Sequence, residues 1–136
     1  KRDCGAFFGS IQGTLCHLLF ADQIWMHRFG DFPAPAVTSI AESVTAIADW
    51  DDLLSQRGTV DTAIETWADR LDPAWLAGDL SWYSGALKCD VTRPKWVLVT
   101  HFFNHQTHHR GQVHCLLTQA GVKPGDTDLA FMPSLG

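Results

Sequence analysis

The chain has 136 residues, a length typical of one domain and sufficient to bury a hydrophobic core. Hydrophobic residues make up 46% and charged residues 18%, a globular composition that excludes the disordered and collagen-like classes. The net charge is −5, and the segment from Asp31 to Asp79 contains ten acidic residues but only two arginines. This distribution argues against nucleic-acid binding.

The first expected helix covers residues 5–29, because apolar side chains recur there at three-, four- and seven-residue steps. They fall on nearly all sides of this helix, so we expect it to be buried among several neighbours. Pro33 and Pro35 end the pattern. No apolar run reaches the roughly 18–20 residues of a membrane span, and no signal peptide is recognisable, so we expect no membrane partner.

A second helix, straight or bent, is expected over residues 39–71, with Ser39 and Glu42 in capping-box register. Helical periodicity fails over residues 72–93, where residues 80–83 favour a short strand or hairpin. The last helix begins at Pro94 or Lys95 and ends at Ala120, followed by Gly121 as a C-terminal cap. The tail, residues 122–136, is expected to be extended.

The four cysteines are Cys4, Cys16, Cys89 and Cys115, and they form no CxxC pair. Single cysteines in helices are usually small buried hydrophobes. We therefore expect free thiols in a reducing compartment, the cytoplasm. A metal-binding or reactive thiol is the alternative for Cys16 and Cys115, which adjoin histidines.

Five of the seven histidines lie between His101 and His114, on the last expected helix. Residues four apart share a helix face. The apolar side chains of this helix form a stripe along one face. His105 and His109 fall within that stripe, whereas His101 lies at its edge, His108 further out and His114 on the opposite side. The stripe consists of Leu98, Phe102, Val113, Leu116 and Leu117.

Burial of two adjacent imidazoles is costly unless their nitrogens find partners. A divalent metal is one such partner, and an i, i+4 histidine pair is a known metal-binding spacing. The spacing alone is equally compatible with a hydrogen-bonded pair in the core. His17, inside an apolar segment, is the candidate for a third ligand, although a lone histidine there is more often a satisfied core residue. His27 is expected to be exposed.

Two segments resemble the signature segments of the DinB/YfiT-like family, which is unrelated to the DNA polymerase that shares the DinB name. They are residues 9–25, which contain Cys16-His17-Leu18, and residues 100–112, which contain His105-Gln-Thr-His-His109. The tail segment Gly125-Asp-Thr-Asp-Leu129 also matches. The resemblance covers nearly the whole chain.

The resemblance implies an all-α fold, a DinB-like up-down four-helix bundle that forms a single domain over residues 1–136. It also implies one divalent metal ion bound by His17, His105 and His109. Family members usually carry a whole helix before the segment that matches residues 5–29. We therefore expect either that the sequence is a fragment or that another chain fills this position.

The apolar residues of segment 5–29 exceed what two partner helices can cover, so an exposed patch is expected. A symmetric homodimer would bury it, and many family members are dimeric. The alternative is that the tail, residues 122–136, folds back over the patch.

Three neutral histidines leave one to three positions on the metal open, the arrangement of a catalytic site. Imidazole suits both Zn²⁺ and Ni²⁺. Polar residues that could orient the ligands are Asp22, Asn104, Gln106 and Gln112. No side chain is recognisable as a general acid or base, so the reactive group would be a metal-bound water or thiolate.

Three functions follow from the resemblance and from the chemistry of such a metal. The first is thiol-dependent S-transfer, in which a low-molecular-weight thiol is the small-molecule partner. The second is metal-dependent hydrolysis. The third is non-catalytic binding of a metal or small ligand in a stress response.

Overall fold

The computed structural model describes residues 2–30, 32–128 and 130, which form five helices and one two-stranded antiparallel sheet. The long helices are α1 (Ile11–Phe29), α3 (Trp50–Asp69) and α5 (Lys95–Gln119). The single-turn helices are α2 (Ile40–Ser43) and α4 (Pro73–Leu76). Strands β1 (Asp79–Ser84) and β2 (Cys89–Pro94) form the sheet. The described chain is therefore mostly helical.

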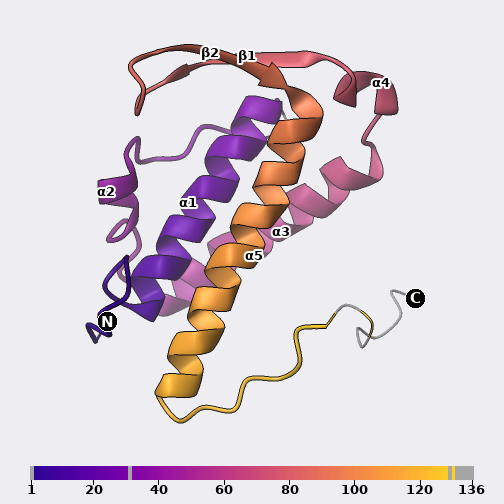
Figure 1. Cartoon of the computed structure of the whole chain (residues 1–136). Coiled ribbons are helices and arrows are strands. Elements are labelled where there is room, and N and C mark those ends of the chain that lie inside the picture. The colour runs from indigo at the N-terminus through magenta and orange to yellow at the C-terminus, as the bar shows by residue number, and fades with distance from the viewer. Residues whose placement is uncertain (1, 31, 129, 131–136) are drawn as a thin grey trace.

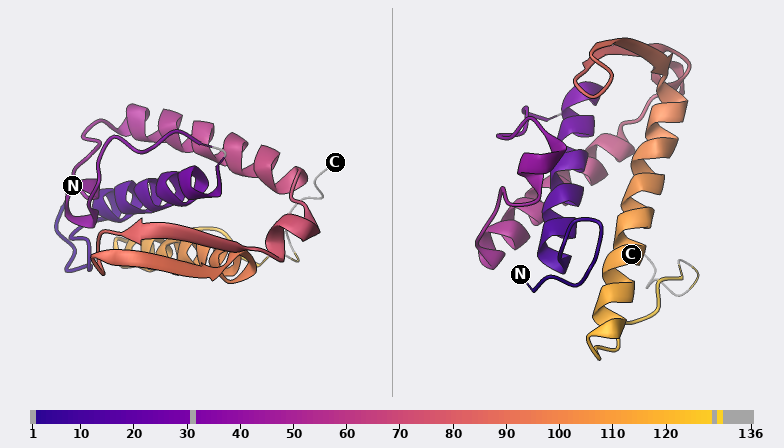
Figure 2. Two further views of the ribbon diagram at one scale, coloured as in Figure 1. Left: turned by 90° about the horizontal axis from the view of Figure 1, so that it is seen from above. Right: turned by 60° about the vertical axis from the view of Figure 1, so that its left-hand side comes forward.

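Helix α1 is the central element of the fold. It lies beside α5 in Figure 1 and between α3 and α5 when the molecule is seen from above in Figure 2. This position follows from its sequence, because a helix that is apolar on nearly all sides must be covered on several sides. The core cluster that the three long helices share is Cys16, Leu19, Met26, Phe29, Leu53, Val60, Ile64, Trp67, Leu98 and Phe102.

The first helix begins later than the sequence pattern indicated, at Ile11 instead of residue 5. The side chain of Ser10 accepts a hydrogen bond from the Gly13 N–H and so caps the helix. Before it, Gly5 and Gly9 adopt positive φ angles of 65° and 75°, which lie outside the helical region. Residues 4–9 form a turn in place of the helix.

The prediction of a single helix over residues 39–71 is wrong, because this segment contains two separate helices. The predicted capping box of Ser39 and Glu42 is present, but it begins only the one turn of α2. Residues 44–49 then interrupt the helix, because the Gln12 side chain donates hydrogen bonds to the carbonyls of Ile47 and Ala48. Helix α3 begins separately, capped by an Asp49 carboxylate oxygen that accepts from the Asp52 N–H at 2.9 Å.

The segment without helical periodicity contains α4 and the hairpin. The expected short strand or hairpin near residues 80–83 is confirmed: Trp82 pairs with Val91 in an antiparallel register. In Figure 1 the hairpin crosses the ends of α1 and α5. The last helix, α5, agrees with the prediction to within one residue at its C-terminus. Gly121 follows it with a φ of 84°, as expected of a C-terminal cap.

The exposed apolar patch expected on the first helix is absent from the described residues. Every residue of α1 except His27 is buried or half-buried, because α3, α5 and the chain from α2 to Asp49 surround the helix. Within the expected segment 5–29, the large apolar side chain that is exposed is that of Phe7, which precedes α1, and others lie on other elements, as Trp50, Tyr83 and Trp96 do. Of the tail proposed to cover the patch, residues 122–128 form neither helix nor strand, and residues 129 and 131–136 lie outside the described part.

None of the helices in the described chain combines the length and the hydrophobicity that crossing a membrane would require. All four cysteines are free, which agrees with the expectation from their spacing. Cys16 is buried, and burial raises the pKa of its thiol. A thiol in this state is a poor nucleophile and a poor metal ligand at neutral pH.

Candidate metal centre

His17 lies in the second turn of α1 and is almost completely buried. Its Nδ1 is 3.3 Å from the Oγ of Ser43, in α2. The single hydroxyl proton of Ser43 is donated to the Ile40 carbonyl at 2.7 Å, so the oxygen accepts from His17. The proton of His17 is therefore on Nδ1, and the lone pair of Nε2 is free to bind a cation.

His105 and His109 lie one turn apart on α5, with their ring centroids 4.3 Å apart. The Nδ1 of His109 donates to the side-chain oxygen of Gln112 at 2.8 Å, which leaves the Nε2 of His109 as a lone pair. This Nε2 is 3.0 Å from the Nε2 of His105. Two nitrogens at this separation share either a proton or a cation between them.

The structure brings His17 together with the pair on α5. One donor nitrogen from each of the three imidazoles lies within 4.8 Å of the other two. No carboxylate or thiol joins this group in the described part of the chain. Such a donor set suits a first-row divalent metal, because imidazole nitrogen is a preferred ligand of zinc and nickel. The residues present therefore fit the ion that the sequence led us to expect.

The electrostatics of the site favour the neutral imidazoles that metal binding requires. Burial lowers the pKa of His17 to about 4, and the adjacent His109 adds to the shift. Burial likewise lowers the pKa of His105 to about 4, with His109 as the next contributor. Burial is also the main cause of a lowered pKa for His109. All three imidazoles are consequently neutral at neutral pH, and each keeps one unprotonated nitrogen.

The polar residues expected to orient the ligands take different positions. Gln112 contacts His109 directly. Asp22 and Gln106 contact each other instead: the Gln106 side-chain nitrogen donates to an Asp22 oxygen at 3.2 Å. Asn104 is exposed.

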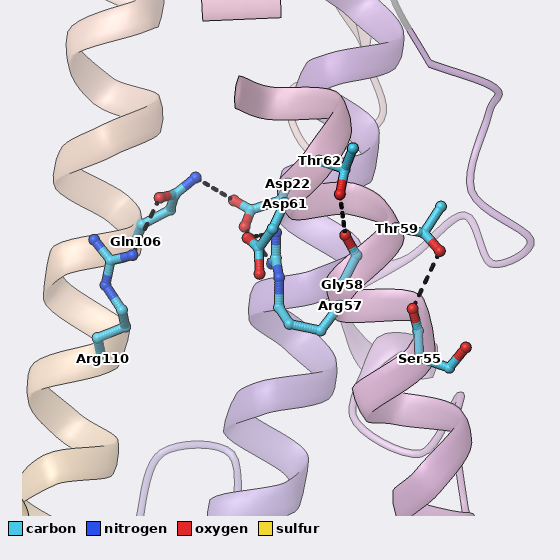
Figure 3. Close-up of polar contacts among 9 residues, drawn as sticks. All are labelled: Asp22, Ser55, Arg57, Gly58, Thr59, Asp61, Thr62, Gln106 and Arg110. Atoms are coloured by element: carbon cyan, nitrogen blue, oxygen red, sulfur yellow. Dashed lines mark hydrogen bonds and ion pairs between the residues drawn. The ribbon is translucent and has the colours of Figure 1, made fainter. Parts of the chain in front are cut away.

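Asp22 and Gln106 belong to a partly buried network that links the three long helices (Figure 3). Arg57, on α3, donates to the second Asp22 oxygen at 2.6 Å. Burial raises the pKa of Asp22 to about 6, against the lowering effect of Arg57. The network connects α1, α3 and α5 through these side-chain hydrogen bonds.

The remaining histidines lie outside the group of converging nitrogens. His101 and His108 are exposed, with ring centroids 5.6 Å from His105 and 4.9 Å from His109, respectively. His114 is half-buried near the end of α5, and His27 is exposed, as expected.

Two residues of the site were missed from the sequence. Ser43 orients His17, but it follows a capping box and lies in no periodic pattern. Phe8 stacks on His17 with ring centroids 4.0 Å apart, although its segment was expected to be helical. Neither residue carries a local signal of its role, because each reaches the centre through a turn that tertiary contacts fix.

Replacing Ser43 with alanine should weaken metal binding by about 10–100-fold, the usual effect of losing a residue that orients a histidine ligand. The physical reason is that His17 would lose the acceptor that fixes its tautomer. Competition titration against a chromophoric chelator measures the effect. Ser55→Ala, an exposed position on α3, is the control and should leave the affinity unchanged. Equal affinities for the two variants would show that Ser43 does not orient the ligand.

The family model described as the DinB family matches residues 1–135. No curated relative and no solved structure matches the chain significantly. The match spans the three histidines and all the described elements, so the chain belongs to the DinB family.

Proposed function

We propose that His17, His105 and His109 bind one divalent metal ion, Zn²⁺ or Ni²⁺, and that the protein uses it for thiol-dependent S-transfer. The observation that carries this proposal is the neutral donor set: three imidazoles converge and no carboxylate joins them in the described residues. Because neutral ligands leave the full positive charge of the ion uncompensated, the centre favours an anionic ligand.

A thiol that has lost its proton is an anionic ligand of the kind this centre favours. When bound, the metal would supply a positive charge that lowers the pKa of the thiol enough to release its proton. The thiol proton passes to solvent, the sulfur forms a bond to an electrophilic carbon, and the leaving group departs with the electron pair of the bond that breaks. No protein base is required, which agrees with the absence of a carboxylate among the described residues around the histidines.

The residues of the chain would serve binding and orientation. Ser43 and Gln112 hold two of the imidazoles through their Nδ1 atoms. Phe8 places an apolar ring against His17 and His109, which limits the access of water to the centre from that side. Hydrolysis and non-catalytic binding are the alternatives expected from the sequence, and the test below separates them.

Metal-loaded protein should be stabilised by a low-molecular-weight thiol and not by its S-methyl derivative. A ligand at 100 times its dissociation constant stabilises the folded state by about 2.7 kcal/mol. Thermal unfolding of the zinc and nickel forms measures this effect, with glutathione and S-methylglutathione as probes. The His109→Ala variant is the control, because it should show no thiol response.

Equal stabilisation by both probes would contradict a role for the sulfur and leave hydrolysis as the better candidate. Tight metal binding without response to any thiol would favour the non-catalytic alternative. The four-helix bundle implied by the resemblance, the pairing of two copies and the cytoplasmic location stay predictions.

A further inference from the structure

Phe7 and Phe8 are adjacent in sequence but differ sharply in their surroundings. The side chain of Phe7 is 86% exposed, whereas that of Phe8 is 9% exposed. The Phe8 ring stacks on His17 with an interplanar angle of 25°, and its centroid is 5.5 Å from that of His109. Phe8 thus contacts two of the three candidate ligands, and Phe7 contacts only Phe8 among the described rings.

The position of Phe8 is not explained by the hydrophobic core. The core cluster of the described residues is formed by α1, α3 and α5, and Phe8 lies outside it. The described aromatic partners of its ring are Phe7 and the two histidines. The ring is therefore buried against the metal centre itself.

The turn before α1 fixes this position by hydrogen bonds. The Cys4 N–H donates to the Gly9 carbonyl at 2.8 Å, and the Gly9 N–H donates to the Ala6 carbonyl at the same distance. The Phe8 carbonyl accepts from the Ser10 N–H at 2.9 Å. The positive φ of Gly9 allows the chain to turn from Phe8 into the helix cap.

Gly13 allows the turn to lie directly on α1. A β-carbon at this position would clash with the carbonyl oxygen of Phe8 and would lie 2.9 Å from a Val44 methyl group. Any larger residue at position 13 would consequently displace the Phe8 backbone from the helix. The close approach at Gly13 therefore keeps the Phe8 backbone in the position from which its ring stacks on His17.

We propose that Phe8 is a positioning residue of the metal centre, which holds the His17 ring and closes the centre on the side of the α1 N-terminus. Metal and substrate then enter from the side of His105, which is half-buried and whose ring centroid is 5.6 Å from that of the exposed His101. This inference rests on the proposed function, since it assigns Phe8 a role toward the bound metal.

The test uses the cobalt-loaded protein, because Co²⁺ replaces zinc and its visible absorption is more intense at low coordination number. Phe8→Ala should release Co²⁺ to a chelator about 10-fold faster than the unaltered chain, in line with the loss of an apolar shell around a metal. It should also weaken the visible absorption, because water gains access to the ion. In both the release rate and the absorption, Phe8→Leu should lie between the unaltered chain and Phe8→Ala.

Phe7→Ala is the matched control and should leave both readouts unchanged. Gly13→Ala keeps the Phe8 ring but displaces its backbone, so it should accelerate release as Phe8→Ala does. Circular dichroism of the metal-free variants identifies any that do not fold. A purely structural role for Phe8 would lower the melting temperature without altering the cobalt spectrum.

If the unaltered chain binds Co²⁺ but Phe8→Ala and Phe7→Ala share its release rate and spectrum, the role of Phe8 is overturned and the metal centre stands. Failure of the unaltered chain to bind Co²⁺, Zn²⁺ or Ni²⁺ would overturn the proposed function and this inference with it.

Discussion

His109→Ala is expected to abolish retention of the metal by the purified protein. Loss of a residue that merely orients a ligand already costs about 10–100-fold in affinity. Loss of a ligand should therefore cost more than about 100-fold, and two imidazoles cannot hold the ion through dialysis. His105→Ala should behave in the same way, because its Nε2 lies 3.0 Å from that of His109. Elemental analysis after dialysis measures both losses.

His108→Ala and His114→Ala provide the controls for this prediction. His108 is the sequence neighbour of His109, and its ring lies near that of His109, yet it is exposed and outside the group of converging nitrogens. Both controls should retain about one ion per chain, as the unaltered protein should. Equal loss of metal in His108→Ala and His109→Ala would mean that the ligand pair on α5 is assigned incorrectly.

Asp22→Ala should lower the free energy of unfolding by about 3 kcal/mol, and the melting temperature by roughly 10 °C. Asp22 is 2% exposed and accepts from Arg57 on α3 and from Gln106 on α5. Its removal leaves the partly buried guanidinium of Arg57 without its shortest ion pair. The guanidinium then keeps only the exposed Asp61 as its partner, and a partly buried charge that is incompletely compensated is costly. Urea unfolding of the metal-free protein measures the difference.

Asp61→Ala is the matched control, since Asp61 pairs with the same guanidinium at 2.7 Å but its side chain is 57% exposed. Exposed ion pairs contribute only about 0–1 kcal/mol, so this variant should remain close to the unaltered chain. A double variant, Asp22→Leu with Arg57→Met, should recover much of the stability because it removes both charges. Equal destabilisation by Asp22→Ala and Asp61→Ala would contradict a special role for the buried carboxylate.

The sequence alone determined the features that depend on local periodicity. The 3.6-residue repeat of α5 places His105 and His109 on the face that carries Leu98 and Phe102, because a regular helix sets the direction of each side chain. The spacing could not decide whether the two histidines bind a metal or form a hydrogen-bonded pair in the core. His17 was a candidate from its apolar segment, the family resemblance favoured it as the third ligand, and the structure brings it beside the pair through the packing of α1 on α5.

Only the tertiary structure decided the features that depend on contacts between distant segments. The Gln12 side chain holds the carbonyls of residues 47 and 48, which separates α2 from α3 where periodicity favoured one helix. That break brings Ser43 to His17, and the close approach at Gly13 brings Phe8 to the same ring. Such turns are fixed by single side-chain hydrogen bonds and close contacts, which leave no repeating pattern along the chain. The sequence therefore indicates the ligands of the candidate centre, but it does not indicate the residues that orient them.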